Sequence, residues 1–291
     1  MVDVTSGDIS YASHAVIDTS TPTRRTRTGD LRQAKLAGAP WPMLTSYDQY
    51  TAALFDRVGI PVLLVGDSAA NNVFGHTSTL PVTVDEMLPL VRAVVRSTSR
   101  ALVVGDLPFG SYEDGVSQAL ATAVRYLKEG GCQAVKLEGG VRVAPQIRKI
   151  SEAGIPVMAH IGFTPQSEHG LGGYRVQGRG SDAARILEDA HAVADAGAFA
   201  VVLQMVPGQL SAQITSELSI PTVGIGAGPD CDAQVLVWQD VMGLRGAPAP
   251  RFVKQYADLS GVISDAAQAF AADVRARTFP AAQHTFTMEA Q

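Results

Sequence analysis

Six polar side chains lie at the ends of successive apolar runs, where they can take part in acid–base or metal chemistry. They are Asp67 and Ser68 in VGDS, Asp106 in VGDLP, Lys136 and Glu138 in VKLEG, and His160 in MAHIG. Three carboxylates that face one small space repel one another, and their pKa values rise unless a cation lies between them. Mg²⁺ suits such a site, because it takes a few carboxylates and completes its octahedron with waters and ligand oxygens. No paired His or Cys spacing in the sequence indicates zinc.

Each of these residues also has a structural alternative. An aspartate at position 67 or 106 can cap the helix that follows it. Lys136 and Glu138 share one face of a strand and can form a plain surface ion pair. A single histidine such as His160 is often a core residue. Because all of them occur at successive strand ends, we favour a functional site.

The elements that must position these residues alternate between short apolar runs and longer segments with helical spacing. The predicted strands are Pro42–Thr45, Val62–Gly66, Ala101–Asp106, Ala134–Leu137, Pro156–His160, Ala200–Met205, Thr222–Ile225 and Val235–Trp238. The predicted helices are Val84–Ser97, Val116–Glu129, Val143–Ala153, Asp182–Ala196, Leu210–Leu218 and Ala257–Thr278. Continuous apolar strands that alternate with helices indicate a parallel sheet covered by helices. Eight such units in about 250 residues favour an α/β fold of the (β/α)8 barrel type over a doubly wound open sheet.

The predicted domain organisation is one barrel over residues 36–285. Residues 1–35 are expected to form a mobile N-terminal arm and a short helix, and residues 286–291 a tail. The glycine-rich segment Gly162–Gly180 is long for a loop of this fold and is expected to act as a lid. The alternative for it is a disordered surface insertion.

Composition narrows the classes of partner. The net charge of -5 and the pI near 5.7 provide no basic field for nucleic acid. No apolar run approaches the roughly 18 residues that span a bilayer, so no membrane partner is expected. Cys132 and Cys231 are expected to be free thiols, as in a reducing cytoplasm. We therefore expect a cytoplasmic protein that acts on a small molecule.

The motifs resemble those of one family, the ketopantoate hydroxymethyltransferases, over about residues 25–285. The matching stretches are MLTSYD (43–48), LLVGDS (63–68), GHTSTLPVT (75–83), DLPFGSY (106–112), VKLEGG (135–140), AHIGFTPQS (159–167), GGYRVQGRG (172–180) and IPTVGIGAGPDCDAQVLVWQD (220–240). The resemblance implies a (β/α)8 TIM barrel of the phosphoenolpyruvate/pyruvate-type superfamily, assembled as a homodecamer. It also implies Mg²⁺-dependent transfer of a hydroxymethyl group from 5,10-methylenetetrahydrofolate to 3-methyl-2-oxobutanoate. The product, 2-dehydropantoate, belongs to pantothenate biosynthesis.

The same resemblance implies roles for the six polar residues. Asp67 and Asp106 would bind Mg²⁺ directly and so face the substrate, with Glu138 in or close to the coordination shell. Ser68 and Lys136 would hold the carboxylate of the oxo acid, and His160 would line the pocket.

One position departs from the family's pattern. The resemblance implies a glutamate base at the end of strand six, in a pattern E-x-V-P, but this chain has Gln204 in QMVP. A carboxamide can hydrogen-bond a ligand but has no useful basicity near neutral pH. Three interpretations stay open: a paralog with related carbon–carbon chemistry on another 2-oxo acid, a variant that traps a ligand, or a non-catalytic homolog. Glu168 and His169 in the lid are candidate substitute bases, and the alternative is that both are merely exposed.

Overall fold

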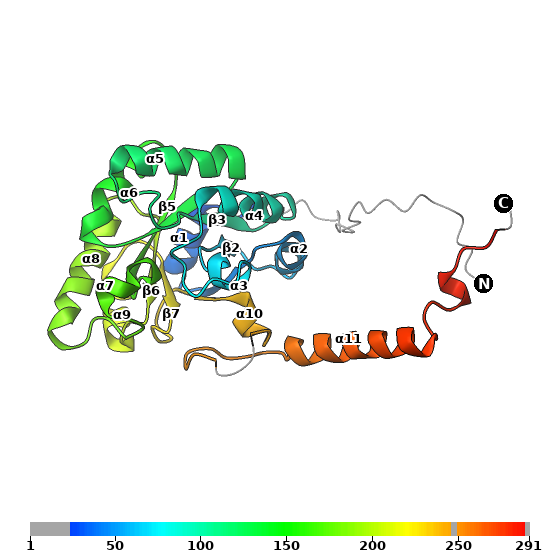
Figure 1. Ribbon diagram of the computed structural model, residues 1–291. Coiled ribbons are helices and arrows are strands. Elements are labelled where there is room, and N and C mark those ends of the chain that lie inside the picture. Colours follow the sequence, from blue (N-terminus) through cyan, green and yellow to red (C-terminus); the bar gives the residue numbers. More distant parts are fainter. Residues whose placement is uncertain (1–23, 246–248, 289–291) are drawn as a thin grey trace.

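Eight parallel strands close into a barrel, which confirms the predicted fold class (Figure 1). The structure is a computed structural model that describes residues 24–245 and 249–288. The strands run in chain order and the last pairs with the first. They are β1 (Trp41–Thr45), β2 (Val62–Val65), β3 (Leu102–Asp106), β4 (Ala134–Glu138), β5 (Val157–Gly162), β6 (Ala200–Gln204), β7 (Thr222–Ile225) and β8 (Ala233–Leu236). All eight predicted strands are present, each with both ends within two residues of the prediction.

Helices surround the barrel as the alternating pattern indicated (Figure 1). The longer ones are α1 (Thr28–Leu36), α2 (Gln49–Arg57), α4 (Val84–Arg96), α5 (Val116–Arg125), α6 (Ala144–Glu152), α8 (Ala183–Asp195), α9 (Gly208–Glu217) and α11 (Leu259–Ala276). Three helices of four residues follow strand ends: α3 (Ala69–Asn72), α7 (Glu168–Leu171) and α10 (Trp238–Val241). The six predicted helices are confirmed, although the last turn of the second is a π-helix, Tyr126–Gly130.

Alternation along the strands divides the apolar residues into two layers. Val62, Leu102 and Val104 belong to a cluster inside the barrel, whereas Leu63 and Val103 pack under the helices. Successive side chains of a strand point to opposite faces. The inward phase continues to the carboxyl ends of β3 to β6, so it directs four charged or titratable residues and one amide into the barrel mouth: Asp106, Lys136, Glu138, His160 and Gln204.

Strand register brings these residues to one level. Asp106 is paired with Lys136, and Glu138 with His160, across neighbouring strands. Gly162 is paired with Gln204 across β5 and β6. The parallel register therefore assembles the predicted residues from positions up to about 100 apart in the sequence.

Buried polar contacts attach the outer elements to the barrel. The Asp56 carboxylate, at the end of α2, accepts hydrogen bonds from the backbone N–H groups of Ser99, Arg100 and Ala101 at 2.9, 2.9 and 2.6 Å. Arg25 donates to the backbone oxygens of Thr98 and Ala101. The chain from residue 24 is therefore attached to the amino end of β3. Of the arm and short helix predicted for residues 1–35, the helix is present as α1, and residues 1–23 lie outside the described residues.

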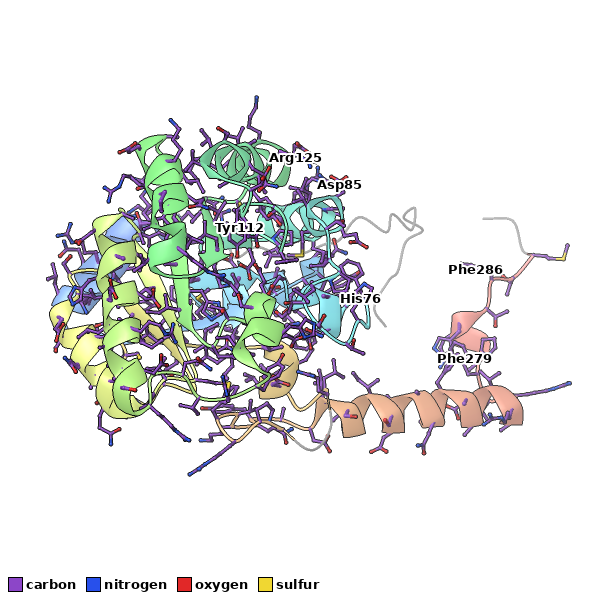
Figure 2. All side chains as sticks on the ribbon, turned by 60° about the vertical axis from the view of Figure 1, so that its left-hand side comes forward. His76, Asp85, Tyr112, Arg125, Phe279 and Phe286 are labelled. Atoms are coloured by element: carbon purple, nitrogen blue, oxygen red, sulfur yellow. The ribbon has the colours of Figure 1, made fainter. Side chains whose placement is uncertain are left out.

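The C-terminal helix α11 lies apart from the barrel (Figure 1). None of its residues is buried. Phe279 and Phe286, beyond its end, also lie away from the barrel, whereas Tyr112 lies within it (Figure 2). The domain predicted over residues 36–285 thus includes a helix, α11, that does not pack on its own barrel. In the described part of the chain, no helix combines the length and apolar character needed to cross a membrane.

Candidate active site

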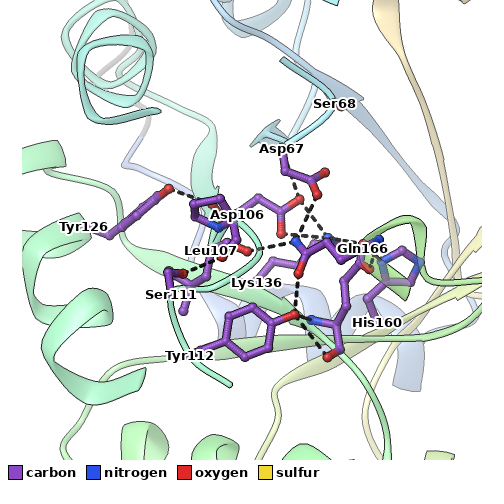
Figure 3. Close-up of polar contacts among 12 residues, drawn as sticks. Asp67, Ser68, Asp106, Leu107, Ser111, Tyr112, Tyr126, Lys136, His160 and Gln166 are labelled. Carbon is purple, nitrogen blue, oxygen red and sulfur yellow. Dashed lines mark hydrogen bonds and ion pairs between the residues drawn. The ribbon is translucent and has the colours of Figure 1, made fainter. Parts of the chain in front are cut away.

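A charged cluster at the mouth of the barrel contains four of the predicted residues (Figure 3). The Lys136 ammonium donates to both carboxylate oxygens of Asp106 at 2.7 and 2.8 Å, and lies 3.9 Å from Glu138 Oε1. The backbone N–H of Asp67 donates to Asp106 Oδ2 at 3.1 Å. Each of these four residues is at most 4% exposed. The alternative of a surface ion pair is therefore wrong for Lys136 and Glu138. Neither aspartate caps the helix that follows it, because α3 and α5 begin after Ser68 and Gly115 without a side-chain cap.

Burial and mutual repulsion control protonation in this cluster. Burial raises the pKa of Asp67, and the charge on Glu138 raises it further. Burial also raises the pKa of Asp106 well above its usual value, although Lys136 opposes the shift. Burial disfavours the charged form of Lys136, but the neighbouring carboxylates, Asp106 foremost, outweigh that and raise its pKa. The cluster thus retains protons unless another cation neutralises it.

Glu138 and His160 form the other half of the cluster and contain unpaired polar atoms. His160 Nδ1 lies 3.1 Å from Glu138 Oε1, a close contact that makes an ion pair when the ring is protonated. Within the described part of the chain, Glu138 Oε1 and both ring nitrogens of His160 are buried and are assigned no hydrogen bond. Burial opposes ionisation of Glu138, yet His160, Lys136 and a backbone N–H outweigh it and lower its pKa. Buried polar atoms without partners are rare, and here they indicate a ligand site.

Gln166, in the lid segment (residues 162–180), binds three sides of the cluster and was not predicted. Its backbone N–H donates to Glu138 Oε2 at 3.0 Å, and its Nε2 donates to Asp67 Oδ2 at 2.9 Å and to the Leu107 carbonyl at 3.0 Å. Its Oε1 accepts a hydrogen bond from the Tyr112 hydroxyl. The start of the lid is therefore anchored on the charged residues (Figure 3). Gln166 and Tyr112 stand inside the quoted motifs AHIGFTPQS and DLPFGSY, which is the signal that could have revealed them.

Ser68 lies beside the cluster, at the start of α3. Its hydroxyl is 2.7 Å from the hydroxyl of Tyr47, another residue that the sequence reasoning did not single out. The hydrogen bond directs the Ser68 side chain, and Ser68 is only partly buried, so a ligand can reach it.

The three predicted metal ligands divide into an adjacent pair and a separate residue. Within residues 24–245 and 249–288, no three His, Cys, Asp or Glu side chains are arranged to hold one ion. Asp67 and Asp106 are adjacent, but Glu138 is directed to His160 and to the N–H of Gln166. The physical reason is that the Lys136 ammonium lies between Asp106 and Glu138 and takes the position of a cation there.

Gln204 and the two candidate bases of the lid lie in different environments. Gln204 ends β6 and is half-buried, and its backbone oxygen accepts the N–H of Phe163 at 2.8 Å. Met205 follows with φ of 51°, which is unusual for a residue other than glycine. The Glu168 side chain is 15% exposed, whereas that of His169 is 82% exposed. The interpretation as a merely exposed lid residue thus holds for His169 and not for Glu168.

A closed parallel barrel with buried carboxylates, a lysine and a histidine at the carboxyl ends of its strands defines a TIM-barrel enzyme of the α/β class. The sequence profile of one family, described as ketopantoate hydroxymethyltransferase, matches residues 25–282. The chain belongs to the ketopantoate hydroxymethyltransferase family. A relative from Nocardioides sp., named 3-methyl-2-oxobutanoate hydroxymethyltransferase, is 63% identical over 92% of this chain and 91% of its own length. A relative of the same name from Mycobacterium tuberculosis is 60% identical over 92% of this chain and 95% of its own length.

Solved structures share the fold at much lower identity. Phosphonopyruvate hydrolase, in a complex with oxalate and Mg²⁺, has a TM-score of 0.56 and 12% identity, and the match covers 89% of this chain and 93% of that chain. The enzyme 2,3-dimethylmalate lyase, described as a PEP mutase/isocitrate lyase superfamily member, has a TM-score of 0.55 and 17% identity over 90% and 92% of the two chains. These similarities agree with the predicted (β/α)8 TIM-barrel fold.

Proposed function

We propose that this chain transfers a hydroxymethyl group from 5,10-methylenetetrahydrofolate to 3-methyl-2-oxobutanoate and forms 2-dehydropantoate. Family membership over nearly the whole chain supports the reaction. The observation that carries the proposal is the buried cluster of Asp67, Asp106, Lys136 and Glu138 at the barrel mouth. An oxo acid has a keto oxygen and a carboxylate. The cluster provides the Lys136 ammonium as one cation, and its carboxylates can bind a second, metal cation.

The donor set fits Mg²⁺ as a cofactor. Three carboxylates face one ammonium, which leaves a formal charge of about −2 when all are ionised and His160 is neutral. Asp67 and Asp106 would hold the ion, since Mg²⁺ is usually bound by one or two carboxylates and keeps several waters. When bound, the ion polarises the keto oxygen of the substrate.

The chain's own residues would bind and orient the oxo acid. The Lys136 ammonium has three N–H donors. Two of them bind the two carboxylate oxygens of Asp106, so the third is free for the substrate carboxylate. The Ser68 hydroxyl, directed by Tyr47, would bind the same carboxylate. His160 would line the inner wall, where its unpaired nitrogens need a polar neighbour. Gln166 ties the start of the lid to Asp67 beside this site.

An assay of product formation tests the function. We expect 2-dehydropantoate from 3-methyl-2-oxobutanoate and 5,10-methylenetetrahydrofolate with Mg²⁺, and loss of activity with a chelator. Asp67→Asn should abolish activity, whereas Asp265→Asn on the exposed helix α11 should keep it. Oxo-acid binding without turnover would instead support a non-catalytic homolog, which the amide at Gln204 favours. Turnover of a different 2-oxo acid would support a paralog.

We also propose that the protein is a homo-oligomer, a decamer by family resemblance, in which α11 packs on a second copy. Ile263, Phe270 and Val274 are 46–59% exposed and recur at helical spacing on one face of α11. On α2, Tyr50 and Leu54 are also exposed, one turn apart. Large exposed apolar patches mark interaction sites.

Analytical ultracentrifugation tests the role of α11. Phe270→Asp should lower the assembled mass, because it places a charge on the apolar stripe. Gln268→Asp, on the opposite face of the same helix, should leave the mass unchanged. Assembly that is insensitive to Phe270→Asp would refute this role.

A cytoplasmic location is proposed on the state of the cysteines. Cys132 and Cys231 are both buried free thiols, as predicted, and a reducing compartment preserves that state.

A further inference from the structure

The proposed reaction needs a base, and the barrel wall offers few. The proton on C3 of the oxo acid must be removed before C3 can attack the methylene carbon of the folate. Gln204 has no basic atom. Asp67 and Asp106 are engaged with Gln166 and Lys136, and the Lys136 ammonium is paired. Glu138 is engaged on both oxygens, because Oε2 accepts the Gln166 N–H and Oε1 lies 3.1 Å from His160 Nδ1. A base must therefore come from another element at the barrel mouth.

His160 is unsuitable for this task. Its side chain is 3% exposed and its Nδ1 is directed at Glu138. A base that works through many cycles must pass its proton on to water or to the leaving group. The buried ring on β5 lies below the lid and lacks that access.

We propose that Glu168 is the catalytic base of this chain, a role that rests on the proposed function. Its side chain is mostly covered, in contrast to its neighbour His169. Among the described residues, its one ion-pair contact is with His169 Nε2, at 4.0 Å. No hydrogen bond of the described residues engages its carboxylate, which is thus held near the mouth without a structural partner.

Two anchors place Glu168 at the mouth. Gln166, two residues earlier, is bonded to Glu138 and Asp67, and two residues span at most about 7 Å of chain. On the other side, the Glu168 carbonyl accepts the N–H of Gly173, next to Tyr174. The lid turn that carries Glu168 is therefore attached directly to the charged cluster.

Tyr174 lies next to the lid turn that carries Glu168 and packs against the start of the lid. Its ring packs on Phe163 with centroids 4.5 Å apart, and the Phe163 N–H donates to the Gln204 carbonyl. Burial raises the pKa of Tyr174, and the charges on Glu168 and Asp67 raise it further. The contact between Tyr174 and Phe163 thus links the lid turn to the end of β6.

The outer face of the lid turn lines a cavity of its own. Ser167, Gly170 and Leu171 line a cavity of about 540 Å³ between the lid and α8, whereas Glu168 does not line it. Glu168, although its side chain is only 15% exposed, therefore does not face this outer cavity. The carboxylate that β6 lacks is thus supplied by the lid.

The chemical step is a single proton transfer. The C3–H bond breaks as an O–H bond forms on the Glu168 carboxylate, and the electron pair becomes the C2–C3 double bond of an enolate whose charge lies on the keto oxygen. In deuterated water, the acid exchanges its proton with solvent and returns deuterium to C3.

Exchange of the C3 hydrogen of 3-methyl-2-oxobutanoate in D₂O with Mg²⁺, followed by NMR, tests this role. We expect exchange by the wild-type protein and a loss of about 10²–10⁴-fold in Glu168→Gln. Glu188→Gln, an exposed carboxylate of the same size on α8, is the matched control and should exchange as wild type. Calorimetry should show unchanged binding of the oxo acid to Glu168→Gln, because only the base is lost.

A second variant separates a chemical role from a structural one. Gln204→Glu in the Glu168→Gln background should restore exchange, since it returns a carboxylate to the end of β6. Unchanged exchange in Glu168→Gln, with product formation intact, would overturn the role of Glu168 alone. Loss of exchange in His169→Gln instead would assign the base to that residue and also overturn it. Wild-type protein that binds the oxo acid without exchange would overturn the proposed function together with its base.

Discussion

Replacement of Lys136 by methionine tests how much the buried ion pair between Lys136 and Asp106 contributes to the stability of the fold. The ammonium is 4% exposed and supplies both short contacts to the Asp106 carboxylate. Without it, Asp106 keeps the backbone N–H of Asp67, at 3.1 Å, and faces two further buried carboxylates. Removal of one partner of a buried ion pair costs about 3–5 kcal/mol, because the other charge is left uncompensated. That is a large part of the roughly 5–15 kcal/mol that holds a typical protein folded.

The double variant Lys136→Met/Asp106→Asn separates the pair from its parts. We expect it to be more stable than Lys136→Met alone, since it removes the stranded charge together with its partner. The assay is urea unfolding followed by circular dichroism, at one protein concentration and without Mg²⁺. Lys149→Met, on the exposed face of α6, is the control and should change the unfolding free energy by less than about 0.5 kcal/mol.

Two results would refute this reasoning. A loss below about 1 kcal/mol in Lys136→Met would mean that Asp106 is already protonated and needs no partner. Equal stability losses that simply add in the double variant would mean that the two residues do not interact. Either result would also weaken the assignment of a cation site beside Asp106.

Two further substitutions test how the barrel supports the site. Asp56→Ala should lower the unfolding free energy by about 1–3 kcal/mol in urea melts, because it removes the hydrogen-bond acceptor of backbone N–H groups at the start of β3. The control Asp85→Ala, at an exposed carboxylate, should have little effect. Equal losses in the two variants would contradict the interpretation. Gly105→Ala places a Cβ 2.5 Å from the ring of Tyr126, whose hydroxyl donates to the Asp106 carbonyl. This substitution should lower the unfolding free energy by about 1–3 kcal/mol and reduce turnover. The control Gly29→Ala has open space around the new Cβ and should be neutral or stabilising. A tolerated Gly105→Ala would show that the Tyr126 ring can move.

The barrel was predictable because parallel strands buried on both faces have continuous apolar sequences. Runs such as VLLV in β2 and AVVL in β6 have no other plausible place in a chain of this composition. The four-residue helices α3, α7 and α10 were not predictable in this way, since one helical turn has no periodicity to detect. The helix α2 was also missed. Its position follows from the fold, which requires a helix between β1 and β2, more than from its sequence.

The residues of the site were predictable as a set, but their pairings were not. The strand-end positions of Asp106, Lys136 and Glu138 follow from the apolar runs that precede them. That Lys136 binds Asp106 depends on the stagger between neighbouring strands and on side-chain rotamers, which the sequence does not reveal. Gln166 was missed because a neutral amide in a loop carries no chemical signal until the loop is folded onto the cluster.

The placement of charge explains why a lid residue can take over from a strand residue. The barrel mouth already holds three carboxylates and one ammonium in a dry space, and a fourth carboxylate at Gln204 would add to their repulsion. A carboxylate on the lid is partly hydrated at 15% exposure and adds less to that repulsion. Gln166 couples the two sites, because the hydrogen bonds that tie the lid to Asp67 and Glu138 also set the position of the turn that carries Glu168. In this arrangement the base reaches its working position only when the lid is docked, so proton removal is confined to the docked state of the lid.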